Sequence, residues 1–369
     1  MLTLRDDPRV VLVLDAGGTS FRFDAVQGGR RLLDAPHTRP SLGHDLERSL
    51  GQITGGFAAA HEATGRKAVA LSLAFPGPAD YASGVIGDLP NLRGFRGGVP
   101  LGPMLAARFG LPTFINNDGA LFAYGEALGG WLPFVNEALA AAGSPHRFRN
   151  LLGVTLGTGF GGGLVIDGRL VVGDNSAAGQ LWMMRHRDDR QRVAEEGASI
   201  RGVRDAYARA AGISPDDAPE PQRIAEIAAG AAPGHGSAAR EAFQRLGQVA
   251  GDAIGNALAL VDGLVVLGGG ISGAARWFRP ALLAELNSTL ETSSGPVDRL
   301  PCNVLDLDDP AGLAALLAPD TIALPVPGTT RTVAYAPRKR TGVGVTRLGT
   351  TAAIALGAYA FALDQLDAT

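Results

Sequence analysis

The sequence predicts an α/β fold made of two halves with a similar order of elements. Three observations support this prediction. Apolar strand-like runs alternate with helix-like stretches, the same order occurs in both halves, and 369 residues are enough for two ordinary domains. The halves share this order of elements but not their residues, so the repeat is one of topology.

The first half opens with three short strands separated by glycine turns. Phe21, Phe23 and Ala25 alternate with polar residues, which is typical of a strand with one buried face. Longer apolar and helix-like stretches follow. The expected elements are strands at 10–14, 21–25, 31–33, 68–74 and 113–115, and helices at 42–63 and 101–109.

The second half repeats this order around a hairpin at Asp167-Gly168. Residues 131–150 are expected to be an insertion between the halves. An extra hairpin is expected within 305–346, where Pro and Gly interrupt alternating residues. The other expected elements are strands at 151–156, 163–166, 169–172 and 264–267, and helices at 198–211, 221–230, 238–261 and 350–366.

Charge and cysteine content exclude several classes of protein. The net charge is −3 and the isoelectric point about 6.1, so no basic surface for nucleic acid or an anionic membrane is expected. The single cysteine, Cys302, excludes a disulfide framework and a multi-cysteine zinc site. We expect a cytoplasmic protein, because no signal peptide is evident and no apolar run reaches the roughly 20 residues that span a bilayer.

A first glycine loop follows the first strand, with the sequence Asp15-Ala-Gly17-Gly18-Thr19. Two glycines let backbone amides approach an anion, and the Thr19 hydroxyl adds a donor. An aspartate at the strand end can hold the water shell of a cation. An ordinary type I′ hairpin turn explains the same residues about as well.

A second loop of this kind, Gly157-Thr158-Gly159, follows a strand at the equivalent place in the second half. Two such loops across a cleft could hold a polyphosphate from both sides. A purely structural glycine-rich hairpin is a weaker explanation, because it must account for both copies.

Asp118 follows Asn116 and Asn117 where a strand ends and a helix begins. It could be the helix N-cap, a common role of Asp and Asn at this place. Alternatively, it lines a cleft and accepts a proton from a hydroxyl group. The sequence has no Ser- or Thr-based nucleophile motif with a paired histidine, so acyl transfer has no support.

A third glycine turn, Gly268-Gly269-Gly270, follows the strand at 264–267. We interpret it as a surface for the adenine and ribose of a nucleotide. Gly268, Gly270 and Gly273 also satisfy part of a Rossmann fingerprint, but no acidic residue on a following strand is evident.

Taken in order, these motifs resemble the ROK family (repressors, open reading frames and kinases), whose kinases belong to the actin-like and hexokinase superfamily. The similar stretches are 15–19, 75–78, 89–95, 117–126, 157–163 and 267–271. The resemblance implies two actin-like, ribonuclease H-like lobes of mixed sheets flanked by helices around a central cleft. It places an N-terminal lobe at 1–116, a C-terminal lobe at 117–349, and a terminal helix at 350–369 that packs back on the first lobe.

The resemblance implies an ATP-dependent sugar kinase of the glucokinase or fructokinase kind. Such an enzyme transfers the γ-phosphoryl of ATP to a hydroxyl of a hexose or hexose derivative, with Asp118 as general base and Asp15 holding Mg²⁺ through water. The implied sugar ligands are Gly77, Asn91, Asn117, Gln180 and Glu195. The implied ATP ligands are Asp15, Gly17, Gly18, Thr19, Gly157, Thr158, Gly159, Gly268, Gly269 and Gly270.

The sequence departs from the family pattern after the second loop. Gly179-Gln180-Leu181-Trp182 stands where the family usually has Glu-x-Gly-His. A zinc finger with three cysteines normally follows, whereas here only His186 is available, so we expect no structural zinc and a solvated loop. Glu195 still resembles the residue after the finger, and its neighbour Glu196 leaves a shift of one position open.

These departures affect substrate identity more than activity. Trp182 could stack on a sugar face or be a core aromatic. The main alternative is a sugar-binding pseudokinase or sensor of the same fold. A transcriptional regulator is disfavoured because Asp15 leaves no room for a preceding helix-turn-helix, and a dehydrogenase has only the third glycine turn in its favour. Family members are commonly dimers, but the sequence does not indicate a homodimer interface, the sugar, or the hydroxyl that is phosphorylated.

Overall fold

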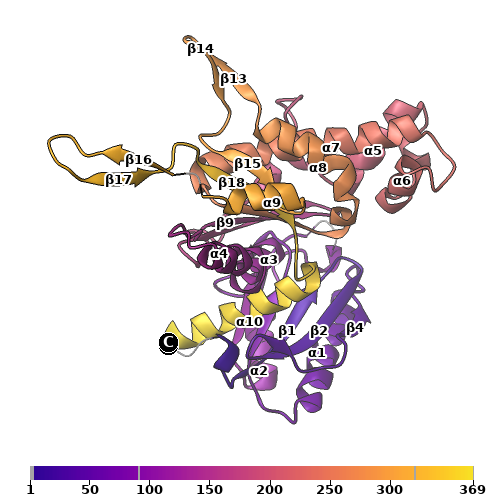
Figure 1. The fold of residues 1–369 in the computed structure, drawn as a ribbon. Coiled ribbons are helices and arrows are strands. Elements are labelled where there is room, and N and C mark those ends of the chain that lie inside the picture. Colours follow the sequence, from indigo (N-terminus) through magenta and orange to yellow (C-terminus); the bar gives the residue numbers. More distant parts are fainter. Residues whose placement is uncertain (1–3, 90–91, 320, 369) are drawn as a thin grey trace. The chain divides into compact units, whose positions relative to one another are not determined.

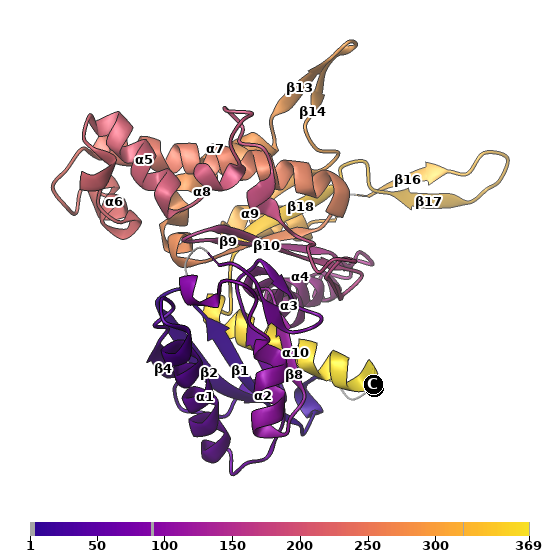
Figure 2. The same cartoon turned by 180° about the vertical axis from the view of Figure 1, so that it is seen from behind.

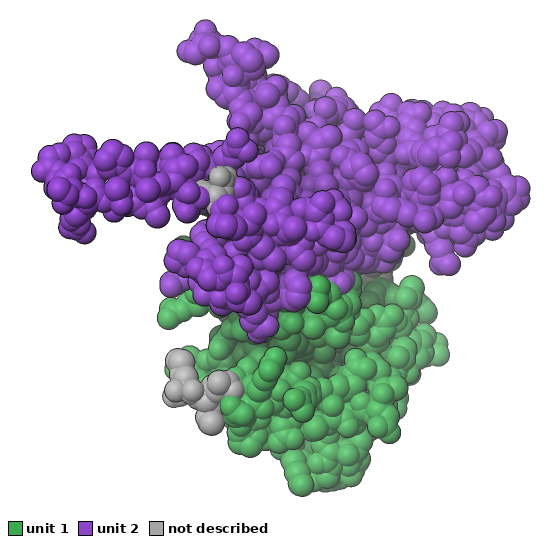
Figure 3. Space-filling view, viewed as in Figure 1, with its two compact units in different colours: residues 1–130, 163–179, 347–369 green, residues 131–162, 180–346 purple. Residues whose placement is uncertain are grey.

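The computed structural model describes residues 4–89, 92–319 and 321–368. The chain divides into two compact units, coloured separately in Figure 3. Unit 1 comprises Met1–Gly130, Gly163–Gly179 and Arg347–Thr369. Unit 2 comprises Trp131–Gly162 and Gln180–Thr346.

Unit 1 is built on a mixed sheet with the order β3-β2-β1-β5-β8, with β4 paired to β2. The central strand β1 runs antiparallel to β2 and parallel to β5. All of its residues except Asp15 are apolar and buried, as expected for a strand covered on both faces. The strands are β1 (Val10–Ala16), β2 (Ser20–Gln27), β3 (Arg30–Arg31), β4 (His37–Pro40), β5 (Ala68–Ala74) and β8 (Thr113–Asn116), with a separate ribbon of β6 (Ala79–Asp80) and β7 (Val85–Ile86).

The helices of unit 1 cover this sheet. The first begins later than the sequence suggests, because the side chain of Asp45 caps it by accepting from the Arg48 amide. The helices are α1 (Leu46–Ala63), α2 (Leu101–Phe109), α3 (Asp118–Gly129) and α10 (Thr350–Ala368), with 3-10 turns η1 (Leu4–Asp6) and η2 (Arg93–Phe95).

Helix α10 packs on α3, β1 and β5 within unit 1 (Figure 1). Two glycines allow this close approach. A Cβ on Gly125 would lie 1.9 Å from the Ala353 carbonyl oxygen, and a Cβ on Gly357 would lie 1.9 Å from that of Leu121. Because α3 packs so tightly on α10, it belongs to unit 1. The expected lobe boundary between residues 116 and 117 therefore falls inside this unit, whose first segment ends at Gly130.

The second large sheet has the order β11-β10-β9-β12-β18-β15. Three neighbouring pairs of this sheet are parallel: β9 with β12, β12 with β18, and β18 with β15. The hairpin at Asp167-Gly168 is present, with positive φ at both residues as a type I′ turn requires. The strands are β9 (Leu151–Leu156), β10 (Phe160–Ile166), β11 (Arg169–Val171), β12 (Leu264–Gly268), β15 (Asn303–Asp306) and β18 (Arg340–Val345); β11 and the end of β10 belong to unit 1.

The long helix α7 is the core helix of unit 2 and packs against α5, α6 and α8. The expected insertion after residue 130 contains α4 and packs against β12 and α9. The helices are α4 (Trp131–Ala141), α5 (Ile200–Ala211), α6 (Pro221–Ala228), α7 (Gly236–Val261), α8 (Ala275–Leu286) and α9 (Pro310–Leu317). The 3-10 turns are η3 (Leu181–Met183), η4 (Ala194–Glu196), η5 (Pro215–Asp217) and η6 (Gly270–Ala274).

Two hairpins project from the body of unit 2 in both views (Figures 1 and 2). One consists of β13 (Thr289–Thr292) and β14 (Gly295–Asp298), which the sequence analysis does not anticipate. The other consists of β16 (Ile322–Pro325) and β17 (Thr332–Tyr335), which is the hairpin expected within 305–346. Of the helices described, none combines the length and apolar character needed to cross a bilayer.

Candidate active site

The first glycine loop joins β1 to β2 in unit 1. The Gly17 amide donates to the Ser20 carbonyl (3.0 Å), and Ser41 holds the loop by donating to the carbonyls of Thr19 and Gly18. Gly17, Gly18 and Thr19 are exposed. Neither glycine has the positive φ that a type I′ turn needs, so that alternative is wrong. The amides of Gly18 and Thr19 donate to no acceptor in the described part of the chain, which leaves them available for an anion.

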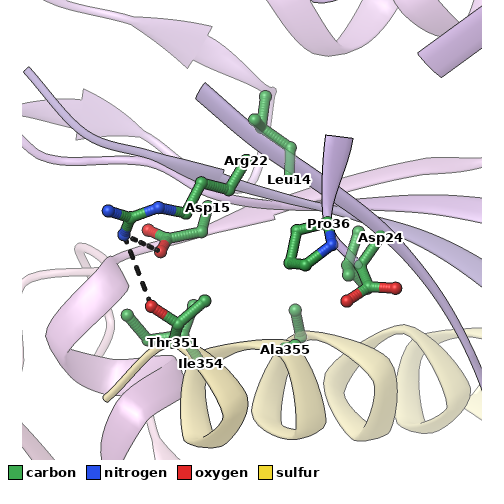
Figure 4. Close-up of a pocket in the computed structure, with 10 residues that line it drawn as sticks. Leu14, Asp15, Arg22, Asp24, Pro36, Thr351, Ile354 and Ala355 are labelled. Atoms are coloured by element: carbon green, nitrogen blue, oxygen red, sulfur yellow. Dashed lines mark hydrogen bonds and ion pairs between the residues drawn. The ribbon is translucent and has the colours of Figure 1, made fainter. Parts of the chain in front are cut away.

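Asp15 lies directly opposite Arg22 in the β1–β2 ladder. Their side chains form an ion pair of 3.6 Å, and the Arg22 guanidinium also donates to the Thr351 hydroxyl at the start of α10 (3.4 Å; Figure 4). Behind Asp15 lies a small, mainly apolar pocket that includes Leu14 and Ile354. Arg22 therefore balances a carboxylate whose other surroundings are poor in polar groups.

Electrostatics distinguish Asp15 from an ordinary surface aspartate. Its side chain is only 16% exposed. Burial and the nearby Asp118 carboxylate raise the pKa of Asp15 to about 6, against the opposing effect of Arg22. Because Asp118 contributes to this shift, the structure brings these two predicted carboxylates into one electrostatic site.

Asp118 is the first residue of α3, not its cap. Asn117 caps the helix, and its side-chain oxygen accepts from the amides of Gly119 (2.9 Å) and Ala120 (3.2 Å). The N-cap interpretation of Asp118 is therefore wrong. One Asp118 oxygen accepts from the Gly119 amide (2.9 Å), and burial raises the pKa of Asp118 above its usual value although the side chain keeps some solvent access.

Tyr81 belongs to this cluster, although no motif in the sequence indicates it. Its hydroxyl donates to the Phe75 carbonyl (2.9 Å) and accepts from the Asn117 side-chain amide (3.3 Å). The same hydroxyl lies 3.1 Å from where a Cβ on Gly77 would be. Burial raises the pKa of Tyr81 far above its usual value, so it stays a neutral donor. The structure thus connects Gly77 and Asn117, whereas Asn91 lies outside the described residues.

The second glycine loop joins β9 to β10 at Gly157-Thr158-Gly159. The Gly157 amide donates to the Gly159 carbonyl (3.0 Å), and the Ile200 amide donates to the Gly157 carbonyl (2.8 Å). Thr158 is exposed at its tip. The loop is thus fixed at its base by backbone hydrogen bonds, with a hydroxyl at its exposed end.

Glu195 contacts this loop within unit 2. Its Oε2 accepts from the Phe160 amide (3.0 Å), and a Cβ on Gly159 would lie only 2.8 Å from the same oxygen. Arg201 lies 3.9 Å from Glu195, and the neighbouring Glu196 forms ion pairs with Arg192 and Arg201. Of the two glutamates, Glu195 is therefore the one that contacts the loop.

The third glycine turn lies against the second. Gly269 has φ +86°, and a Cβ there would lie 2.3 Å from the Leu156 carbonyl oxygen, so both its conformation and its surroundings require glycine. At Gly270 a Cβ would meet no atom within 4 Å. The turn leads into the 3-10 turn η6, and α8 begins only at Ala275. It therefore lacks the helix that directly follows a Rossmann glycine turn.

The segment after Gly179 is a folded loop with its own hydrogen bonds. The Trp182 indole donates to the Gln180 side-chain oxygen (2.6 Å), and Trp182 is 36% exposed. The interpretation of Trp182 as a core aromatic is therefore wrong. His186 Nδ1 accepts from the Asp188 amide (3.2 Å). Among the residues described, no three His, Cys, Asp or Glu side chains are grouped so that they could hold a metal ion.

The model of the ROK family matches residues 11–317. The chain belongs to the ROK family. An N-acetyl-D-glucosamine kinase of Vibrio vulnificus is 30% identical over 271 residues, which cover 70% of this chain and 83% of the relative. A glucokinase of Thermotoga maritima is 29% identical over 179 residues, or 47% of this chain and 50% of the relative.

Solved structures agree with this membership. A glucokinase from Parabacteroides distasonis is 48% identical, with a TM-score of 0.85 over 98% of this chain and 99% of that chain. A ROK family glucokinase from Streptomyces griseus, in complex with glucose and AMPPNP, has a TM-score of 0.65 at 21% identity over 95% and 98% of the chains, a level that reports on fold alone. The predicted α/β fold of mixed sheets flanked by helices is thus confirmed for this ROK protein.

Proposed function

We propose that this ROK protein is a sugar kinase that transfers the γ-phosphoryl group of ATP to a hydroxyl of a hexose or hexose derivative. The observation that carries the proposal is the pair of carboxylates Asp15 and Asp118 beside an exposed glycine loop in unit 1. The resemblance to relatives named glucokinase and N-acetyl-D-glucosamine kinase supports it.

Asp118 is the general base of this proposal. Its backbone position is fixed because Asn117 caps α3, and its side chain keeps solvent access in a largely buried setting. Burial raises the pKa of Asp118, which increases its affinity for the proton of a hydroxyl. Phosphoryl transfer needs little covalent help from a protein, so holding the acceptor hydroxyl beside this carboxylate is the main task of unit 1.

Asp15 fits a role beside a hydrated magnesium ion. Mg²⁺ usually keeps several waters and takes one or two carboxylates, with phosphate oxygens of the substrate as further ligands. The influence of the Asp118 carboxylate on the pKa of Asp15 supports this role, because a cation near Asp15 would also be attracted by Asp118. When bound with ATP, Mg²⁺ would offset negative charge on the phosphates. Asp15 holds its water shell, and Arg22 orients Asp15.

The glycine loops bind the nucleotide in this proposal. The exposed amides of Gly18 and Thr19 and the exposed Thr158 hydroxyl are donors for phosphate oxygens. Gly17, Gly157 and Gly159 allow the backbone to approach those oxygens closely. The turn at 268–270 takes the adenosine, because the open space beside Gly270 leaves room for a ligand.

Sugar recognition uses Asn117, Gly77 and Glu195, together with Tyr81, which holds the Asn117 amide. Gln180 presents an amide whose oxygen is already bound by Trp182, so its NH₂ group is free to donate to a sugar hydroxyl. Trp182 offers an exposed ring for an apolar sugar face. The 48% identity with a protein named glucokinase favours glucose as the first substrate to test.

A screen of ADP release tests the proposal. Purified protein with ATP and Mg²⁺ is mixed with glucose, fructose, mannose, glucosamine and their N-acetyl forms, and calorimetry measures sugar binding in parallel. We expect ADP release only in the presence of one or a few sugars, together with a phosphorylated product. Sugar binding with no ADP release for any sugar would contradict the proposal and support the alternative, a sugar-binding sensor without turnover.

A further inference from the structure

Ser41 follows directly after β4 and contacts the first glycine loop. β4 pairs with β2 in a register that sets Ser20 opposite Pro40, so Thr19 and Ser41 are the next pair of residues (Figure 1). In a regular antiparallel ladder such a pair exchanges two backbone hydrogen bonds or none. Here the Ser41 amide donates to the Thr19 carbonyl (3.0 Å), but the Thr19 amide donates to no acceptor among the residues described. The ladder is therefore broken at the Thr19 amide.

The side chain of Ser41 accounts for this break. Its hydroxyl donates to the Gly18 carbonyl (2.7 Å), which belongs to the same peptide group as the Thr19 amide. In a trans peptide such as this one, the C=O and N–H groups point in opposite directions. Because the Gly18 carbonyl is held toward Ser41, the Thr19 amide is turned away from Ser41.

Burial separates the residue that holds the loop from the amide that it turns. Ser41 is only 3% exposed, whereas Gly18 and Thr19 are both exposed. One buried residue thus holds two successive carbonyls of the loop, one with its amide and one with its hydroxyl. Backbone amides that point outward and lack an acceptor in the protein are typical of anion-binding loops.

The backbone after Ser41 is strained, and its neighbours hold it in place. Leu42 has φ +49°, in the left-handed region that bulky residues rarely adopt. The Gly43 carbonyl accepts from the Gly94 amide (2.7 Å), and a Cβ on Gly43 would lie 2.2 Å from the Leu92 side chain. Strained residues persist where their surroundings fix them, and they cluster at functional sites. The strain at Leu42 therefore supports a functional reason for the position of Ser41.

We propose that Ser41 is a positioning residue whose hydroxyl turns the Thr19 amide toward a phosphate oxygen of bound ATP. The inference rests on the proposed function, because the nucleotide is its ligand. Ser41 does not touch the phosphate and acts through the Gly18 carbonyl. Without the hydroxyl, this peptide group is free to turn, and the Thr19 amide can complete the ladder by donating to the Ser41 carbonyl. The loop then offers one donor fewer to the phosphate.

Two serine variants separate this role from a purely structural one. Ser41→Ala removes the hydroxyl and keeps the backbone bond to Thr19. Ser72→Ala is the matched control, because Ser72 is fully buried in β5 of the same unit and donates to the Ala358 carbonyl at the same distance of 2.7 Å. Each variant loses one hydrogen bond from serine to a carbonyl, so similar falls in the thermal midpoint are expected. Only Ser41→Ala is expected to change phosphate binding.

Calorimetry without sugar measures the binding of MgATP, magnesium tripolyphosphate and adenosine. Ser41→Ala is expected to raise Kd for the two phosphate ligands about tenfold or more, as one hydrogen bond to a charged group is lost. Its Kd for adenosine should stay within about twofold of the wild type, and Ser72→Ala should bind all three ligands like the wild type. An unchanged Kd for MgATP in Ser41→Ala, or an equal rise in Ser72→Ala, would overturn the inference. A wild-type protein that binds no MgATP would instead overturn the proposed function, and this inference with it.

NMR of protein with isotopically labelled threonine observes the Thr19 amide directly. The variant Thr19→Ser identifies its resonance, because it removes that one labelled residue. At saturating MgATP the wild-type resonance is expected to move downfield, as the N–H group donates to a charged oxygen. This shift should be lost in Ser41→Ala and kept in Ser72→Ala. The same downfield shift in Ser41→Ala as in the wild type would contradict the role of the hydroxyl.

Discussion

The two glycine-and-threonine loops share a sequence pattern but differ in their electrostatic surroundings. The loop after β1 lies beside two carboxylates, Asp15 and Asp118, whose pKa values are both raised. The loop after β9 lies beside Glu195, which accepts a hydrogen bond from the loop itself through the Phe160 amide. The two loops thus differ in what their neighbouring carboxylates do. Asp15 and Asp118 place negative charge near the first loop, whereas Glu195 holds the second loop in place by accepting from the Phe160 amide.

Between the two loops, the larger expected effect is at Asp15. Replacing it with asparagine removes a charge beside the first loop, and kcat for the proposed sugar kinase reaction is expected to fall about 100-fold or more. The matched change in the second loop, Glu195→Gln, keeps an oxygen for the Phe160 amide and is expected to cost about tenfold. Steady-state ADP release measures both. An equal fall of kcat in the two variants would show that the two loops do not differ in the importance of their neighbouring carboxylates.

The raised pKa of Asp15 predicts opposite trends in stability and activity with pH. The folded-state pKa is about 6 against an ordinary 3.8, so the protonated form favours the folded state. Stability contributed by this group is therefore lost as the pH rises from about 4 to about 6, by roughly 3 kcal/mol. Activity should instead rise through pH 6, because the charged carboxylate is the functional form.

Chemical denaturation at several pH values checks the stability trend, with Asp15→Asn as the control that should flatten it. Asp24 and Asp118 also have raised pKa values, so a residual slope is expected in the variant. If the slope of the free energy of unfolding against pH is the same in Asp15→Asn as in the wild type, Asp15 is not the cause of the pH dependence.

Gly159→Ala tests the packing of the second loop. A methyl group there would approach Glu195 Oε2 to 2.8 Å, so the carboxylate has to shift and its bond to the Phe160 amide weakens. We expect KM for the sugar or ATP to rise about tenfold, at a cost near 1 kcal/mol in stability. Gly168→Ala, where a Cβ meets no atom but φ is positive, is a control for backbone strain alone and should leave KM unchanged.

Of the changes considered, metal removal is expected to alter the stability of the fold least. A chelator should stop the reaction by withdrawing Mg²⁺ from ATP, and added Mg²⁺ should restore it. The thermal midpoint should change by no more than about 1 °C, because the loop at 180–193 is folded by its own contacts, including the Arg185–Val193 bridge. A large fall in the midpoint that Zn²⁺ reverses would contradict the expectation of no structural zinc.

The parts of the candidate site that the sequence predicts are local. The glycine loops and Asp118 each occupy a few consecutive residues at the end of a strand, so sequence order identifies them. The N-cap of α3 could not be predicted, because Asn116, Asn117 and Asp118 are all residue types that cap helices well. Only the backbone conformation shows that Asn117 is the N-cap.

The parts that could not be predicted depend on contacts between distant segments. Tyr81 accepts a hydrogen bond from Asn117, 36 residues away, and no pattern in the sequence connects them. The boundary of the first unit depends on Gly125 and Gly357, whose missing side chains let α3 and α10 approach. Glycine is so frequent in this chain that these two positions give no recognisable signal.

The central claim is that Asp118 accepts the proton of the sugar hydroxyl, and the Asp118→Asn variant tests it most directly. Calorimetry should show that the variant binds the sugar and ATP about as well as the wild type, since the Asn117 cap is untouched. Turnover should fall about 100- to 10,000-fold, the usual contribution of a general base. Turnover within about tenfold of the wild type, with binding unchanged, would contradict the account.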